Sequence, residues 1–208
     1  MIIKRYCLGM YQTNCYLLAD DKTKVCAVID PGTVCEELNN DILSSNYDVK
    51  YIIFTHGHFD HIGGMEYYMK LYDKSTVLMH KNDILSILAE YDVFNVNMLD
   101  KEKTVKKITL HNELEEISLG NIILKLIHTP GHSKGSICVY TDGVLFSGDT
   151  LFECSVGRTD FIDGNFNELK NSIKELYELP DDTVVYPGHG DFTTIADEKT
   201  NNPYVREE

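Results

Sequence analysis

The sequence predicts an α/β (α+β) protein in which two mixed β-sheets pack face to face and helices cover their outer faces. Two observations predict this fold class. Short apolar runs of strand length dominate both halves of the 208-residue chain, and each half also contains segments with helical spacing. Two sheets with helices outside would bury these runs economically. No repeat, low-complexity tract or linker interrupts the chain, so we expect a single domain over residues 1–208.

In the first half, apolar runs bounded by turn residues predict strands at 14–19, 25–29 and 50–54. A helix is expected after the second strand, because Thr33 and Glu36 have the spacing of a capping box. The buried face of that helix is predicted to contain Val34, Leu38 and Ile42. Two further helices are predicted, one from the spacing of Ile62, Met65, Met69 and Tyr72, and a capped one that begins near Asn82.

The second half repeats this pattern. Several strands are expected between Ile108 and Tyr140, notably 122–127 and 136–140, and further strands at 143–147 and 183–186. A helix with a capping box at Asn165 and Glu168 separates the last two strands. Its predicted buried stripe consists of Phe166, Leu169, Ile173 and Leu176.

Composition and charge restrict the classes of partner. Acidic residues outnumber basic ones 33 to 19, for a formal charge of −14, which argues against nucleic acid or an anionic membrane as partner. No apolar run approaches the length of a membrane span, and charges at Lys4 and Arg5 interrupt the region where a signal peptide is apolar. The six cysteines form no C-x-x-C pair and predict buried, reduced thiols. We therefore expect a cytoplasmic protein with a small-molecule partner.

The most informative stretch is the histidine-rich segment 55–61, which contains His56, His58, Asp60 and His61. It lies between a predicted strand and a predicted helix, where Gly57 lets the backbone bend without steric cost. Imidazole nitrogen beside carboxylate oxygen suits borderline cations such as zinc, iron or manganese. The segment therefore predicts a metal site.

Three more candidate ligands follow apolar strands in the same way. His132, Asp149 and His189 each come directly after a glycine, at the end of a predicted strand. Four strand ends that present ligands at one rim match the needs of a site for two metal ions, and an aspartate can bridge such a pair through its two oxygens.

This set of residues resembles the metallo-β-lactamase superfamily, and the short glyoxalase II-like (hydroxyacylglutathione hydrolase-like) enzymes in particular. The matching stretches begin near residue 12 and end near residue 204: 12–18, 30–32, the histidine motif, 129–133, 147–152, 157–160, 186–190 and 202–204. The resemblance implies a four-layer αββα sandwich with the metals at one edge. In one respect the chain departs from this pattern: full glyoxalase II enzymes carry a C-terminal helical substrate domain, for which we expect no counterpart here.

The resemblance further implies a role for each ligand. His56, His58 and His132 would hold one metal, Asp60, His61 and His189 would hold a second, and Asp149 would bridge them. The expected cofactor is two divalent ions, zinc in the first instance and iron or manganese as alternatives. The implied enzyme is a metallo-hydrolase that cleaves a thioester, an S-2-hydroxyacyl thiol such as S-lactoylglutathione, by a metal-bound hydroxide that Asp60 orients.

Charge counting favours an anionic substrate in spite of the acidic chain. Two divalent ions contribute +4, while Asp60, Asp149 and a hydroxide contribute −3, so the loaded site has a net charge of about +1. Arg158 stands where glyoxalase II-like enzymes place a basic substrate contact, and a guanidinium pairs well with a carboxylate. An ion pair between Arg158 and Asp160 or Asp163 is the alternative interpretation.

Other functions remain open at this point. Persulfide dioxygenases look like the same family and hold a single iron, for which His56, His132 and Asp149 would serve. A lactonase of the same superfamily is a further alternative. A non-catalytic binding module is a third class, although such a protein would usually have lost several ligands. The physiological thiol, the metal, the number of ions and the oligomeric state are not determined by the sequence.

Overall fold

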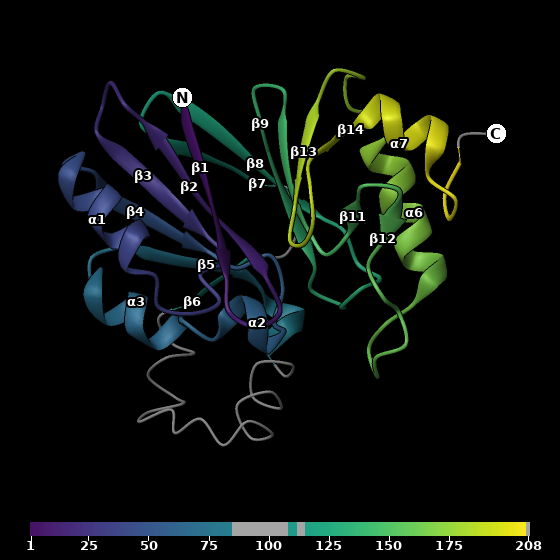
Figure 1. The fold of residues 1–208 in the computed structure, drawn as a ribbon. Helices are drawn as coiled ribbons and strands as arrows, with labels where there is room; N and C mark the ends of the chain where they lie inside the picture. The colour runs from purple at the N-terminus through teal and green to yellow at the C-terminus, as the bar shows by residue number, and fades with distance from the viewer. Residues whose placement is uncertain (85–107, 112–114, 207–208) are drawn as a thin grey trace.

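Two six-stranded mixed sheets form the centre of the molecule (Figure 1), in a computed structural model that describes residues 1–84, 108–111 and 115–206. The strands of the first sheet stand in chain order. β1 and β2 pair antiparallel, as do β2 and β3, whereas β3 to β6 run parallel. Their bounds are β1 Ile2–Leu8, β2 Thr13–Asp20, β3 Val25–Ile29, β4 Asp48–Ile53, β5 Thr76–His80 and β6 Ile108–His111.

The second sheet has the order β14-β13-β10-β9-β8-β7. Only β10 and β13 pair in parallel within it. Its strands are β7 Glu115–Leu119, β8 Ile122–His128, β9 Ile137–Thr141, β10 Val144–Gly148, β13 Val184–Pro187 and β14 Thr193–Thr194. A separate hairpin of β11 Leu151–Phe152 and β12 Ser155–Val156 follows β10.

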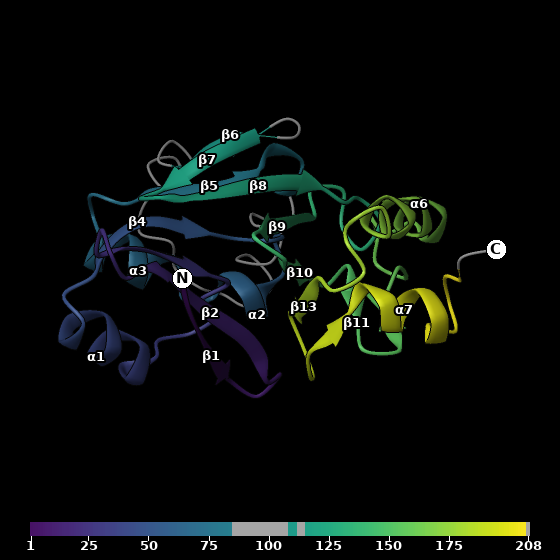
Figure 2. The ribbon, with the colours of Figure 1, turned by 90° about the horizontal axis from the view of Figure 1, so that it is seen from above.

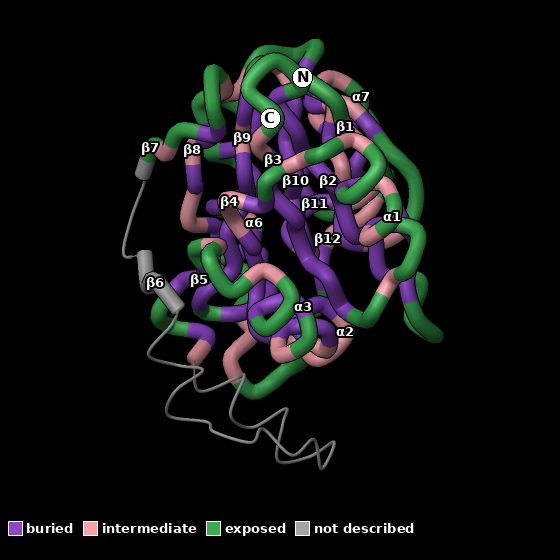
Figure 3. Tube along the Cα trace, turned by 90° about the vertical axis from the view of Figure 1, so that its left-hand side faces the viewer, coloured by how far each residue is buried: buried purple, intermediate pink, exposed green. Residues whose placement is uncertain are grey.

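Helices cover the outer faces of both sheets. α1 (Glu36–Ser44) and α3 (Met65–Leu71) lie on one side of the molecule, and α6 (Phe166–Leu176) and α7 (Ile195–Asn201) lie on the other (Figure 2). Buried residues concentrate in the strands between them (Figure 3). The structure therefore confirms the predicted fold class, a sandwich of two mixed sheets with helices outside.

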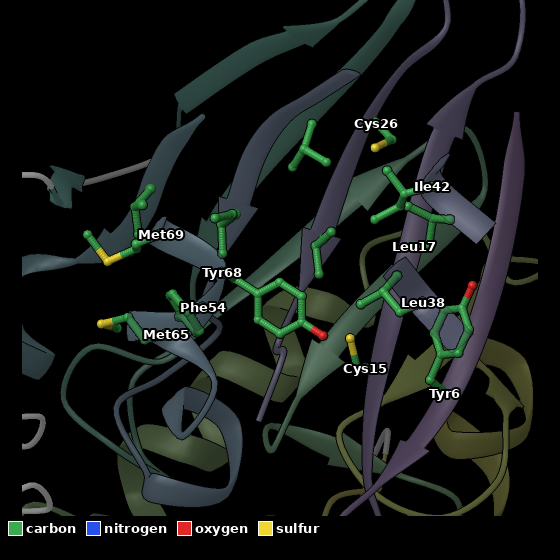
Figure 4. Close-up of a cluster of buried hydrophobic side chains, with 14 of the residues drawn as sticks. Tyr6, Cys15, Leu17, Cys26, Leu38, Ile42, Phe54, Met65, Tyr68 and Met69 are labelled. Carbon is green, nitrogen blue, oxygen red and sulfur yellow. The ribbon is translucent and has the colours of Figure 1, made fainter. Parts of the chain in front are cut away.

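Alternation along the strands explains why the sequence showed continuous apolar runs. In β2, Leu17 faces α1 and Leu18 faces the second sheet, and both are fully buried. Ile52 and Ile53 of β4 divide in the same way. Because successive side chains point to opposite faces, a strand between two packed layers must be apolar at every position. Figure 4 shows the outer cluster that the first sheet forms with its helices.

The first helix begins later than predicted. Thr33 is not its cap: α1 begins at Glu36, and the Cys35 sulfur accepts the hydrogen bond from the Leu38 backbone N–H. The reason is tertiary, because the Cys35 backbone N–H donates to the hydroxyl of Tyr68 in α3 and holds position 35 at the helix start. Val34 is consequently exposed, whereas Leu38, like Ile42, is buried as predicted.

The predicted helix around 62–72 is interrupted. It consists of α2 (Phe59–Ile62) and α3, which are separated at Gly63 and Gly64. The Gly64 N–H donates to the Pro31 carbonyl at 3.1 Å, and a Cβ on either glycine would collide with the 31–32 backbone. This close approach breaks the helix, so that α2 and α3 are two separate elements.

Other predictions agree with the structure less completely. The sequence analysis named no separate strand or helix for β1, β5, β11, β12, β14 or α7. Phe166, which was placed in the predicted buried stripe of α6, is exposed, as are two of the six cysteines, Cys7 and Cys154. The helix predicted near Asn82 lies outside the described residues except for a 3-10 turn at Lys81–Asp83. The α6 cap is confirmed, because Asn165 accepts from the backbone N–H groups of Asn167 and Glu168. No described helix is long and apolar enough to cross a membrane.

Candidate metal centre

Four loops carry the seven predicted ligands, and the structure brings all seven side chains together. Each loop follows the carboxyl end of a strand: β4, β8, β10 or β13. The first loop supplies His56 and His58 and leads into α2, which supplies Asp60 and His61. Each of the other loops supplies one side chain. The seven residues are His56, His58, Asp60, His61, His132, Asp149 and His189.

A first group consists of three imidazoles. His132 Nε2 lies 3.2 Å from His56 Nε2 and 2.8 Å from His58 Nδ1. One nitrogen of each ring lies within 4.8 Å of the others. Three ring nitrogens that face one another at this distance form a natural cage for a borderline divalent cation.

A second group combines a carboxylate with two imidazoles. Asp60 Oδ2 lies 3.1 Å from His189 Nε2 and 3.5 Å from His61 Nε2. The same oxygen accepts a hydrogen bond of 2.8 Å from the Thr13 hydroxyl, which fixes the orientation of the carboxylate. Like the first group, these three residues present ligand atoms within 4.8 Å of one another.

Asp149 lies between the two groups. Its Oδ1 is 3.3 Å from His61 Nε2, and its Oδ2 is 3.6 Å from the Nε2 atoms of both His132 and His189. One carboxylate therefore contacts the first group through His132 and the second through His61 and His189. This is the geometry that a bridging ligand requires.

Two buried atoms at the centre indicate that a cation fits here. Among the described residues, His61 Nε2 and Asp149 Oδ1 are buried without a hydrogen-bond partner. Leaving a buried polar atom without a partner costs on the order of 1–3 kcal/mol, so such atoms call for an explanation. A divalent ion between them would satisfy both atoms, and the donor set of imidazole and carboxylate suits it.

The outer nitrogens of the rings are held by hydrogen bonds. His61 Nδ1 lies 3.0 Å from Asp30 Oδ2, and His56 Nδ1 lies 3.1 Å from the Thr55 hydroxyl, which itself donates to Asp30. His132 Nδ1 faces the Arg158 carbonyl at 2.8 Å. Each of these contacts places the ring proton on Nδ1 and leaves the Nε2 lone pair for the cage.

His189 and His58 complete this pattern with one difference. His189 Nδ1 lies 3.1 Å from the Tyr11 carbonyl, so its Nε2 also faces the cluster. His58 instead presents Nδ1 to the cage, because it is that nitrogen that lies beside His132. No feature of the sequence indicated which nitrogen each ring uses.

The two groups differ in their electrostatics. Burial and the neighbouring imidazoles lower the pKa of His56 well below its ordinary value and that of His58 to about 4. Burial acts in the same direction on His61, but Asp149 and Asp30 outweigh it and raise its pKa. His61 and the other histidines in turn outweigh the burial of Asp149 and lower its pKa to about 2. His56 and His58 are therefore neutral, whereas His61 lies beside carboxylates of opposite charge.

A pocket of about 740 Å³ opens onto the cluster. Aromatic side chains form much of its wall. The Phe161 ring centroid lies 4.6 Å from that of His58, and the Phe152 ring lies 6.1 Å from that of His189. The other lining residues include Tyr11, Phe59, Val156 and Arg158.

Arg158 lines this pocket but is already paired. Its Nε and Nη2 atoms each donate to one carboxylate oxygen of Asp160 at 2.9 Å, and its guanidinium stacks 4.8 Å from the Phe161 ring centroid. The alternative interpretation, an ion pair with Asp160, is thus observed. A role in substrate binding stays a prediction.

The sequence analysis missed the residues that support the ligands. Asp30 was treated only as part of a turn, although it accepts hydrogen bonds from both the backbone and the side chain of Thr55. Its position directly after an apolar strand, like that of Asp149, was an available signal. Asp83 was also missed, and the sequence offers no feature that separates it from an ordinary helix cap.

Comparison with protein families supports the resemblance that the sequence indicated. A family model described as "Metallo-beta-lactamase superfamily" matches residues 8–189. The chain is 34% identical to "Probable metallo-hydrolase YqgX" of Bacillus subtilis, over 97% of this chain and 96% of that protein. It is 32% identical to "Hydroxyacylglutathione hydrolase GloC" of Haemophilus influenzae, over 94% and 93% of the two chains.

Solved structures show the same fold. The BLEG-1 B3 metallo-β-lactamase has a TM-score of 0.80 at 32% identity, with 98% of this chain and 99% of that chain covered. TTHA1623 in a di-iron-bound form has a TM-score of 0.78 at 31% identity, with 97% and 100% covered. ETHE1 from Myxococcus xanthus has a TM-score of 0.77 at 28% identity, with 98% and 84% covered.

Proposed function

Because the chain belongs to the metallo-β-lactamase superfamily, we propose that it is a metal-dependent hydrolase that holds two divalent ions and cleaves a thioester. One observation carries this proposal. Two groups of ligand atoms, each compact enough for one ion, share the carboxylate of Asp149 and open onto a single pocket. His56, His58 and His132 are the proposed ligands of one ion, and the second group holds the other.

The proposed chemistry follows from this arrangement. When bound, divalent ions would lower the pKa of a water toward 7 and would polarise an acyl carbonyl. Asp60, held by Thr13 and lining the pocket, is placed to orient the attacking oxygen. A thiolate leaving group needs little protonation, so a thioester suits a pocket lined by metal-ligand candidates, aromatic side chains, Ser155, Val156 and Arg158.

The proposed substrate is an anionic S-2-hydroxyacyl thiol, such as S-lactoylglutathione. The similarity to the Haemophilus hydroxyacylglutathione hydrolase supports it. The charge balance of the loaded site, close to +1, also favours an anion. Arg158 would contribute to binding only if the substrate carboxylate replaces or joins Asp160 on the guanidinium.

Zinc is the proposed metal, since the three imidazoles of the first group and the mixed donors of the second suit a borderline ion. The di-iron form of TTHA1623 supports iron as the alternative, and manganese is a further one. Both groups are compatible with either metal. Metal analysis is therefore part of the test below.

A second candidate function is a persulfide dioxygenase with a single iron. The structural similarity to ETHE1 favours it. In that case His56, His132 and Asp149 would hold the iron, while Asp60, His61 and His189 would hold none. The ligand atoms of Asp60, His61 and His189 lie within 4.8 Å of one another, and this closeness argues for the two-ion hydrolase.

The test combines elemental analysis with activity assays on protein purified without added metal. Two equivalents of zinc or iron, together with hydrolysis of S-lactoylglutathione, would support the proposal. One equivalent of iron with oxygen uptake on glutathione persulfide would replace it by the dioxygenase. A lactone and a β-lactam belong in the same panel, because BLEG-1 is a β-lactamase of similar fold. Turnover confined to either of them would assign a different hydrolase.

A further inference from the structure

We propose that Asp83 is a positioning residue for the first ligand group, and that its loss weakens ion binding by His56, His58 and His132 while sparing the second group. This inference rests on the metal-binding part of the proposed function, but not on the choice of substrate. Asp83 is the last residue of the 3-10 turn that follows β5, and its side chain is buried.

Asp83 accepts hydrogen bonds from two loops that lie far apart in the sequence. Its Oδ2 accepts from the Gly57 backbone N–H and from the Ser133 hydroxyl, both at 2.7 Å. Its Oδ1 accepts from the Gly135 backbone N–H. Gly57 stands between His56 and His58, and Ser133 follows His132. One carboxylate therefore links the loop that carries two members of the first group with the loop that carries the third.

The loop after His132 is built to deliver these donors. The hydroxyls of Ser133 and Ser136 lie 2.7 Å apart, and the Ser133 N–H donates to the Ser136 hydroxyl at 3.1 Å. A Cβ at Gly135 would collide with the Asp83 carboxylate, so the absence of a side chain there allows the approach. The geometry at His132 thus depends on a dense local network that converges on Asp83.

Three donors aimed at one side chain require a group that only accepts. A carboxylate has two acceptor oxygens and no competing proton donor, whereas asparagine would turn an NH₂ group toward at least one of these N–H or O–H donors. Burial raises the pKa of Asp83, and the three donors oppose this effect by favouring the charged form. Asp83→Asn should therefore loosen the link with little change in volume.

Asp30 performs the corresponding task elsewhere in the site. It accepts from Thr55 and faces His61 Nδ1, so it orients a member of the second group directly. Asp83 has no such contact with Asp60, His61 or His189 among the interactions of the described residues. This division predicts a selective effect, because partners of this kind typically change metal affinity by about 10–100-fold.

The experiment measures ion affinity directly, by titrating zinc into metal-free protein in competition with a chromophoric chelator. Asp83→Asn is combined with His58→Ala, which disables the first group, and separately with His189→Ala, which disables the second. On the His189→Ala background, Asp83→Asn should weaken the remaining ion by about 10–100-fold. On the His58→Ala background it should change the remaining affinity less than about 3-fold.

Asp20→Asn serves as the matched control. Asp20 is likewise buried and accepts from the Asn121 N–H at 2.8 Å and from the Thr23 hydroxyl at 2.8 Å, but it lies at the end of β2 remote from the ligands. It should lower thermal stability without affecting either affinity. If Asp83 had only a general structural role, Asp83→Asn would weaken the binding of both ions. A loss of affinity that Asp20→Asn also showed would point to the same general role.

Several results would overturn the proposal. These are equal effects of Asp83→Asn on both backgrounds, no effect on the His189→Ala background, or a first group that binds no ion in the wild type. Should Asp83→Asn fail to fold, Ser133→Ala removes one of the three donors and should give the same selectivity with a smaller loss. Wild-type protein that binds ions but cleaves no thioester would refute the proposed function and leave this test intact.

Discussion

The two ligand groups differ in both charge and exposure. The first consists of imidazoles, and His56 and His132 are almost fully buried, at 1% and 3% exposure. The second includes Asp60, and it is more open to solvent, since the side chains of Asp60 and His189 are 21% and 29% exposed. An ion in the first group would keep more of its positive charge, and one in the second would exchange more readily with solvent. We therefore expect the first ion to be the stronger polariser of a bound carbonyl and the second ion to be more accessible to solvent.

Removal of the shared ligand should produce the largest effect. Asp149→Ala takes an oxygen from both groups and leaves His61 Nε2 without its nearest carboxylate oxygen. Loss of an outer partner alone costs about 10–100-fold, so loss of the bridge should lower kcat/KM by more than about 1000-fold and bring the metal content below one equivalent. Elemental analysis and the thioester assay measure both quantities. Retention of two tightly held ions would contradict the bridging role.

Single-group variants should separate the two halves. Asp60→Ala should nearly abolish hydrolysis while the protein stays folded, because it removes both a proposed ligand and the group that orients the attacking oxygen. His58→Ala should reduce the content of the first ion but leave the second. Circular dichroism checks the fold, and metal analysis counts the ions. Unchanged turnover in Asp60→Ala would remove its proposed role.

Chelation should reveal the difference in exposure. We expect release of the ions in two phases, with the faster phase from the more exposed second group and absent in His189→Ala. Complete removal should also lower the melting temperature. Saturation at 100-fold above Kd stabilises by about 2.7 kcal/mol, which corresponds to about 5–10 °C for a chain of this size. A fast phase that persists in His189→Ala would show that exposure does not govern release.

Arg158→Ala should have the smallest effect. If the guanidinium contacts substrate, KM should rise several-fold for anionic thioesters and less for neutral ones. If the ion pair with Asp160 only supports the Phe161 side of the pocket, KM should change equally and only slightly for both substrates, as expected for an exposed ion pair. Matched substrates that differ only in a carboxylate decide between these roles.

Local patterns were sufficient to predict much of the fold. The strands at 14–19, 25–29 and 143–147 match β2, β3 and β10, because a run buried on both faces needs an apolar residue at every position. The Asn165 cap was predictable for a similar reason, since its hydrogen bonds lie within four residues. Failures occurred where distant contacts intervened. Tyr68 moved the start of α1 to Glu36, and the 31–32 backbone split the helix after Ile62.

The candidate site divides in the same way. Each ligand was identifiable because it follows a strand end, and parallel or adjoining strand ends meet at one rim. The supporting role of Asp83 was not identifiable, because its contacts with Gly57 and Ser133 join residues 26 and 50 positions apart. Nothing in the local sequence marks such a residue as different from other surface or capping aspartates.

By itself, then, the sequence determined the layers of the fold, the superfamily and the seven side chains that gather at its edge, because strand periodicity and short motifs are local properties. Only the tertiary structure decided which ring nitrogens face the cage, that Asp149 contacts both groups, and that Arg158 is paired with Asp160. These features depend on distances of a few ångströms between separate loops, and packing of the whole chain sets such distances.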